Sequence, residues 1–206
     1  MSYANIASLT KMARANQIIS AIGSNGIMKF YTGILPSSPD IAPSGTLLAS
    51  LPLSTVAGVA SLAIQKGVVT SPGTGGTNGI YMLTITGTGI GAGGTFTVLG
   101  GVLNSISITA NGRGYTAPTF SGFASAGLTG AAAISVLTGV LIFNTISSAT
   151  SVATGTATFV RVTTSGGTGI MDLDVGTTNS YSVIMSNTFV AMSSTVSISA
   201  NVLTES

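Results

Sequence analysis

Residues 94–109 read GTFTVLGGVLNSISIT, two runs of β-prone residues on either side of a Gly-Gly pair. Before the pair, Phe96 and Val98 alternate with threonines, and after it isoleucines alternate with serines. Alternation of apolar and polar residues between glycine turns is typical of a β-hairpin whose apolar side chains face a core. The stretch therefore predicts antiparallel strands in the middle of the chain.

Similar short strands are predicted along the rest of the chain, separated by glycine, serine and proline turns. Runs of this length and spacing favour a mainly β fold, an antiparallel β-sandwich of Ig-like or jelly-roll-like topology. The proline-rich residues 33–44 are predicted to form a loop, because proline has no N–H to give to a sheet. The other predicted strands are 27–31, 46–53, 81–86, 136–143, 157–162, 171–175, 181–185 and 196–202.

An N-terminal α-helix is predicted over residues 2–22, where apolar residues recur at helical spacing and Gly23 suits the C-terminal cap. Two interpretations stay open for this helix. It is either an arm that docks on a partner, removable without loss of the fold, or a helix packed on its own domain.

Glycine content divides the rest of the chain. Glycine runs between residues 73 and 101 separate short strands, which favours a small β module inserted between the outer strands. Linkers at 63–67 and 124–132 are expected to be its hinges. The predicted domains are an N-terminal helical arm (1–23), an outer β-sandwich domain (24–65 and 131–206) and an inserted glycine-rich β domain (66–130).

Charged residues make up 5% of the chain, against roughly 25% in an average domain. The chain has no His and no Cys, which excludes a Ser-His-Asp triad, a cysteine nucleophile and zinc-finger or iron–sulfur sites. Asp and Glu together number 4, which leaves little for acid–base or two-metal chemistry. We therefore expect a protein that is not an enzyme, without catalytic, cofactor-binding or metal-binding residues and without a small-molecule substrate.

The same properties bear on larger partners. The 6 Lys and Arg residues are scattered, whereas nucleic-acid binding needs clustered cations, so no nucleic acid is expected. The most apolar stretch, residues 131–143, is shorter than the about 20 residues of a membrane-spanning helix, so no membrane is expected either. Lys11 and Arg14 stand where a secretory signal would have its apolar core, which predicts synthesis in a cytoplasm.

Two motifs suggest chemistry but fit simpler structures. Gly89–Gly94 matches the spacing G-x-G-x-x-G, but a strand-like stretch follows where a dinucleotide site needs a helix, so a hairpin is favoured. Tyr115 could stack a sugar or a base. A lone aromatic residue beside glycines is more typical of a turn that covers the end of a hairpin.

Asp172 and Asp174 lie two residues apart and face the same side of a predicted strand. They are either a weak calcium site or two solvated side chains opposite a buried apolar face that includes Leu173 and Val175, and the second interpretation is favoured. Arg161, on the preceding predicted strand, could pair with either aspartate across the sheet.

Several segments share the order and composition of one family of proteins. They are Phe30–Gly33, Thr46–Ala49, Ala153–Arg161, Gly169–Met171, Asp174–Gly176 and Val196–Ser199, together with Gly75–Pro118. In these segments the chain resembles small virion proteins of tailed bacteriophages, and residues 75–118 are similar to a glycine-rich β repeat of phage structural proteins. The resemblance covers most of the chain and implies a virion structural role, without implying any site residues.

The leading hypothesis is a non-enzymatic virion structural protein that decorates and stabilises the exterior of a phage capsid, like a cement protein. The expected partners are the major capsid protein and copies of the chain itself, in a homotrimer, because sheet edges without charge need cover from neighbours. The expected contacts lie on the helix and the proline-rich loop, at Ile6, Leu9, Lys11, Arg14, Pro36, Pro39 and Pro43.

Two alternatives stay open. One is a tail, collar or head-fibre component. The other is a carbohydrate-binding module for host attachment, in which the inserted domain would carry an aromatic patch of Tyr81, Tyr115, Phe120 and Phe123.

Overall fold

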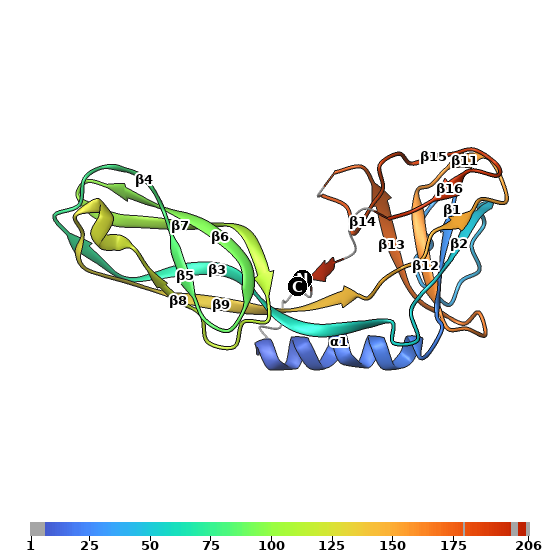
Figure 1. Ribbon diagram of the computed structural model, residues 1–206, viewed down its shortest axis with the longest axis horizontal. Coiled ribbons are helices and arrows are strands. Elements are labelled where there is room, and N and C mark those ends of the chain that lie inside the picture. Colours follow the sequence, from blue (N-terminus) through green and yellow to red (C-terminus); the bar gives the residue numbers. More distant parts are fainter. Residues whose placement is uncertain (1–6, 179, 199–201, 205–206) are drawn as a thin grey trace. The chain divides into compact units, whose positions relative to one another are not determined.

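The computed structural model describes residues 7–178, 180–198 and 202–204 (Figure 1). The protein is mainly β, with one N-terminal helix and several antiparallel sheets, an arrangement consistent with a β-sandwich. The predicted fold class is therefore confirmed. The chain divides into two compact units, of which unit 1 centres on Ser61–Val140, and unit 2 on Ala13–Ala60 with Leu141–Thr204.

Unit 2 is built on a five-stranded sheet in the order β14-β13-β12-β1-β2. Neighbouring strands are antiparallel, except that β14 runs parallel to β13. The five strands are β1 (Ile27–Tyr31), β2 (Leu47–Pro52), β12 (Phe159–Thr163), β13 (Gly169–Gly176) and β14 (Val183–Ile184). The predicted strands over 27–31, 46–53, 157–162 and 171–175 correspond to the first four of these, with ends that shift by up to two residues.

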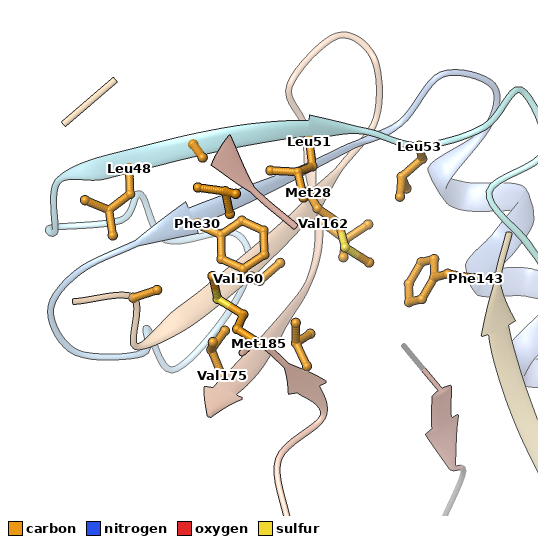
Figure 2. Packing of buried hydrophobic residues seen from close by; sticks show 14 of the residues in the cluster. Met28, Phe30, Leu48, Leu51, Leu53, Phe143, Val160, Val162, Val175 and Met185 are labelled. Atoms are coloured by element: carbon orange, nitrogen blue, oxygen red, sulfur yellow. The ribbon is translucent and has the colours of Figure 1, made fainter. Parts of the chain in front are cut away.

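One face of this sheet forms the core of unit 2 (Figure 2). Met28 and Phe30 lie on one face of β1 because side chains alternate along a strand. Their partners across the ladder are Val162 and Val160, and all four side chains are fully buried. Each such buried side chain contributes about 1.5–3 kcal/mol. The opposite face carries Lys29 and its row neighbours, described below.

Short elements complete unit 2. β10 pairs with β16, β11 pairs with β15, and β17 pairs with β9. The predicted strand over 196–202 is not continuous, because the residues directly after Val196 are not in a strand. The bounds are β10 (Ala149–Thr150), β11 (Gly155–Thr156), β15 (Phe189–Val190), β16 (Thr195–Val196) and β17 (Val202–Thr204).

The helix α1 (Ser8–Ile22) ends at Gly23, whose φ of 68° is the left-handed conformation of a helix cap. In unit 2, its residues Ala15 and Ile22 are 0% and 1% exposed and belong to the core. In unit 1, the Ser8 hydroxyl donates to the Leu137 carbonyl at 2.7 Å. The helix is packed on its own chain, so removal of residues 1–23 is expected to destabilise unit 2 rather than leave the fold intact.

Unit 1 has a second hydrophobic core and its own sheets. One sheet has the order β4-β6-β7, and the other contains β9, β8 and β5, with β3 paired to β9. The elements are β3 (Gly58–Thr74), β4 (Gly79–Met82), β5 (Thr84–Thr86), β6 (Ile90–Leu99), β7 (Val102–Arg113), β8 (Thr119–Ser121), the 3-10 helix η1 (Phe123–Ala126) and β9 (Thr129–Phe143).

The hairpin predicted over residues 94–109 is confirmed as β6 and β7. Gly100 and Gly101 between them have φ of 64° and 78°, a conformation that other residues seldom adopt. Phe96 and Val98 are 0% and 1% exposed in the core of unit 1, as their alternation predicts.

The predicted hinges are wrong. Residues 63–67 lie inside β3, and residues 124–132 begin in η1 and continue into β9. Residues 124–132, rich in small residues and glycine, look like a linker in the sequence, but here they belong to η1, to the turn after it and to β9. The inserted domain was predicted at 66–130, and the compact unit that the structure has there consists of Ser61–Val140 together with the first helix residues, 8–12. The helix is therefore not a domain of its own, because its residues from Ala13 onward belong to unit 2.

Candidate functional site

The predicted contacts on the helix differ in exposure. Ile6 lies outside the described residues. Leu9 is 66% exposed and Arg14 is also exposed, whereas Lys11 is only 9% exposed. Gly139 of β9 explains why Lys11 has little room. A Cβ atom at Gly139 would lie 2.5 Å from the Lys11 carbonyl carbon, so the helix backbone rests directly on the strand.

The other predicted contacts, Pro36, Pro39 and Pro43, are half-buried in the loop between β1 and β2. At its base the Thr32 N–H donates to the Thr46 carbonyl at 3.0 Å, and the Thr46 N–H donates to the Thr32 hydroxyl at 2.9 Å. The loop is therefore closed by reciprocal hydrogen bonds and stiffened by prolines, which restrict the backbone.

A buried ion pair in the sheet is hydrogen-bonded to this loop. Arg161 of β12 donates from Nε and Nη2 to the two carboxylate oxygens of Asp172 on β13, at 2.7 and 2.6 Å. The side chains of the pair are 6% and 5% exposed. Arg161 also donates to the loop carbonyls of Ile41 and Ser38, at 2.6 and 3.4 Å. One guanidinium thus joins two strands and the loop.

The loop and the sheet form a cavity of about 410 Å³ that opens to the surface. Its floor comes from β1 and β12, and its walls come from the loop and from the turn between β12 and β13. Its lining is Lys29, Tyr31, Pro39, Asp40, Ala42, Pro43, Arg161, Thr163 and Gly167–Gly169. Two of the predicted contact prolines are thus brought together with polar residues far away in the sequence.

Pairing across the sheet explains which residues meet in this cavity. Lys29 lies opposite Arg161, and Arg161 lies opposite Asp172, so the three side chains form one row on the same face. Tyr31 and Phe159 form the next row, and their rings stack with centroids 5.3 Å apart. Rows of neighbouring strands bring charged groups within reach of one another.

The electrostatics of the cavity follow from this row. The hydrogen bonds to Asp172 raise the pKa of the Arg161 guanidinium, against the lowering effect of burial. Burial raises the pKa of the Tyr31 phenol above its ordinary value of 10.0, and the nearby Arg161 charge offsets this only in part. Tyr31 is therefore a neutral hydroxyl at physiological pH, able to donate and accept a hydrogen bond.

The structure corrects the interpretation of the two aspartates. Asp172 is not solvated, because Arg161 covers it, and of the two possible partners of Arg161 it is Asp172 that pairs. Asp174 is half-buried and accepts a hydrogen bond from the Ser182 N–H at 2.9 Å. In the described part of the chain, no group of three or more His, Cys, Asp or Glu side chains is placed to hold a metal ion.

The predicted aromatic patch of unit 1 is not a surface patch. Tyr115, Phe120 and Phe123 are 4%, 8% and 7% exposed and belong to the core, and Tyr81 stacks on the buried Phe96. Tyr115 fills the space above Gly89, and its hydroxyl accepts a hydrogen bond from the Ala92 N–H. These rings are therefore not arranged as an exposed platform for a sugar.

The glycine motif of residues 89–94 is confirmed as part of a hairpin, because β6 runs through it and continues to Leu99.

The outer face of the β4-β6-β7 sheet carries apolar side chains that are exposed. It consists of Ile80, Met82, Thr95, Thr97, Ser105 and Ser107, which lie opposite one another across the ladders. Ile80 and Met82 are 73% and 74% exposed.

Sequence reasoning missed Lys29, Tyr31 and Asp40 as members of one cavity. Arg161 was noted as a partner for an aspartate, but nothing in the linear pattern placed it under the proline-rich loop. The one sign in the sequence was a charged residue, Lys29, within an otherwise apolar strand. It indicates a polar site only once the neighbouring strand, and therefore the residue opposite Lys29, is known.

Comparisons of the chain with protein families, with curated proteins and with solved structures found no match. The one α-helix of the described residues is not long and apolar enough to cross a membrane.

Proposed function

We propose that this chain is a non-enzymatic virion structural protein that decorates the exterior of a phage capsid by binding the capsid lattice and its own copies. The observation that carries the proposal is the outer face of the β4-β6-β7 sheet. It displays two large apolar side chains, Ile80 and Met82, among hydroxyl side chains and without a charge.

The chemistry around this face supports an assembly role. Between residues 61 and 140 the sequence has only Lys66 and Arg113 as charged residues. Soluble proteins normally protect exposed strand edges with charge, and β4 is an edge strand of its sheet. An uncharged edge beside exposed isoleucine and methionine is suited to contact with another protein surface. Symmetric contacts between copies are the most common solution, and we propose a homotrimer.

Self-association is tested by the double variant Ile80→Lys/Met82→Lys in the full chain. Two lysines on the outer face would have to lose their water without a counter-ion in a contact between copies, so the variant is expected to sediment as a monomer where the natural chain sediments as a trimer. The matched control is Val152→Lys/Met192→Lys, which places two lysines at side chains that are 61% and 62% exposed in unit 2. A natural chain that is a monomer at high concentration would refute self-association.

Decoration is tested by the copy number in purified particles, measured against the major capsid protein by quantitative mass spectrometry. A number comparable to that of the capsid protein supports decoration. A handful of copies per particle would replace this proposal with a tail, collar or fibre role, and absence from the particle would refute a virion role.

A further inference from the structure

We propose that the cavity under the proline-rich loop of unit 2 binds a neutral sugar unit of a glycan. The proposal concerns a surface separate from the outer face of unit 1. Its volume of about 410 Å³ lies within the roughly 300–1,000 Å³ typical of small-ligand sites.

Two polar groups in the cavity have no partner among the residues that the structure describes. Lys29 lies directly opposite Arg161, an arrangement of like charges that is ordinarily unfavourable in a sheet. Within residues 7–178, 180–198 and 202–204, no acceptor or carboxylate pairs with the Lys29 ammonium, and no group hydrogen-bonds the Tyr31 hydroxyl. Both groups line the cavity, so both are free to bind a ligand.

The third group is an acceptor. Asp40 is exposed on the loop, and its Oδ2 accepts a hydrogen bond from the Ser38 hydroxyl at 3.0 Å. This bond and the hydrogen bond of the Asp40 N–H to the same hydroxyl, at 3.2 Å, hold the carboxylate at the cavity wall. The other carboxylate oxygen is left to accept from a ligand.

Charge selects the ligand class. The cavity is lined by two cations, Lys29 and Arg161, and one anion, Asp40. Because Asp172 neutralises Arg161 in a bidentate pair, the charges around the cavity balance, and neither a phosphate nor an ammonium is specially favoured. A ligand that fits must offer both donors and acceptors without net charge, and the hydroxyl groups of a sugar do so.

The cavity also offers apolar surface and rigidity. Pro39 and Pro43 line it with C–H groups, and the Tyr31 ring is supported by its stack on Phe159. A Cβ atom at Gly169 would lie 2.5 Å from the Pro39 carbonyl oxygen, so the loop rests closely on β13. A preorganised site loses little entropy on binding, which matters for a weakly binding monosaccharide.

The test is saturation-transfer NMR on the full chain with glucose, galactose, mannose and N-acetylglucosamine as free monosaccharides. Binding of at least one is expected, and Lys29→Met and Asp40→Asn are each expected to weaken it about tenfold, because a hydrogen bond to a charged group is lost. Lys66→Met is the matched control, since Lys66 is exposed in unit 1 and should leave binding unchanged.

Three results would overturn the assignment. One is no saturation transfer to any of the four sugars, and another is transfer that Lys29→Met and Asp40→Asn leave unchanged. The third is preference for N-acetylneuraminic acid or inorganic phosphate, which would make the cavity an anion site. The Ile80→Lys/Met82→Lys variant is expected to bind sugar like the natural chain, so failure of the assembly proposal is distinguishable from failure of this one.

Discussion

Replacing Asp172 by Asn tests whether the buried ion pair organises unit 2 and its loop. Asn keeps the shape of the side chain but removes the charge that receives two hydrogen bonds from Arg161, at 2.7 and 2.6 Å. Both side chains of the pair are nearly inaccessible to water. The variant therefore leaves a guanidinium buried without its counter-ion.

The size of the effect follows from what remains bonded. Removing one partner of a buried pair typically costs about 3–5 kcal/mol. In Asp172→Asn the Arg161 guanidinium keeps its bonds to the Ile41 and Ser38 carbonyls, so we expect the lower end, about 3 kcal/mol. Arg161→Met also removes the hydrogen bonds to the loop, so we expect it to lower the free energy of unfolding by the upper end of this range, about 5 kcal/mol. The double variant Arg161→Met/Asp172→Leu leaves no unpaired charge and is expected to be more stable than Arg161→Met.

The assay is urea unfolding at neutral pH, followed by far-UV circular dichroism, with hydrogen exchange of β12, β13 and residues 33–45 to assign the loss to unit 2. Lys29→Met is the control, since it removes a cation from the same row without breaking an ion pair, and it should change the free energy of unfolding by less than about 1 kcal/mol. If Asp172→Asn costs no more than this control, or if Arg161→Met/Asp172→Leu is no more stable than Arg161→Met, the reasoning is refuted.

Three further changes test other parts of the fold. Gly139→Ala would place a Cβ atom 2.5 Å from the Lys11 carbonyl carbon, so a lower melting temperature is expected, with a cost of about 1–3 kcal/mol. Gly166→Ala, where the nearest atom would be 3.7 Å away, is its control, and equal melting temperatures of the two variants would contradict the close contact of helix and strand. Phe96→Ala should cost about 3–5 kcal/mol and remove hydrogen-exchange protection from β6 and β7, and unchanged protection would show that this ring does not organise unit 1. Tyr31 should lose its proton at a higher pH than a free tyrosine, whose pKa is 10.0, because burial raises its pKa in the folded protein. The free energy of unfolding is therefore unaffected by Tyr31 below pH 10.0. It falls as the pH rises through the pKa of Tyr31 in the folded protein. Tyrosinate absorbance should show a late step that Tyr31→Phe lacks, and its persistence in the variant would assign the step to another tyrosine.

The parts of the fold that could be predicted were those that depend on residues adjacent in the sequence. The hairpin of β6 and β7 follows from alternation around Gly100 and Gly101, and the end of the helix follows from Gly23. Strand turns and helix caps depend on the backbone preferences of a few residues, so they can be recognised without knowing the rest of the molecule.

The candidate site could not be predicted in the same way. Asp172 was expected to be solvated, since its own strand gives no sign of the guanidinium that covers it. Residues 63–67 were expected to be a hinge, because nothing in this short stretch reveals that β9 is the partner strand of β3. Tyr115 and the aromatic residues near it were considered as an exposed surface for binding a sugar, but their rings are part of the hydrophobic core of unit 1.

The sequence by itself determined that this protein is mainly β and almost uncharged, and where most of its turns fall. Only the tertiary structure decided that β1 lies beside β12, where Thr163 and Ile27 meet across 136 positions of the chain. That pairing places Lys29, Arg161 and Asp172 in one row under the proline-rich loop. The register between distant strands depends on how both faces of the sheet are buried together, and no local run of residues contains that information.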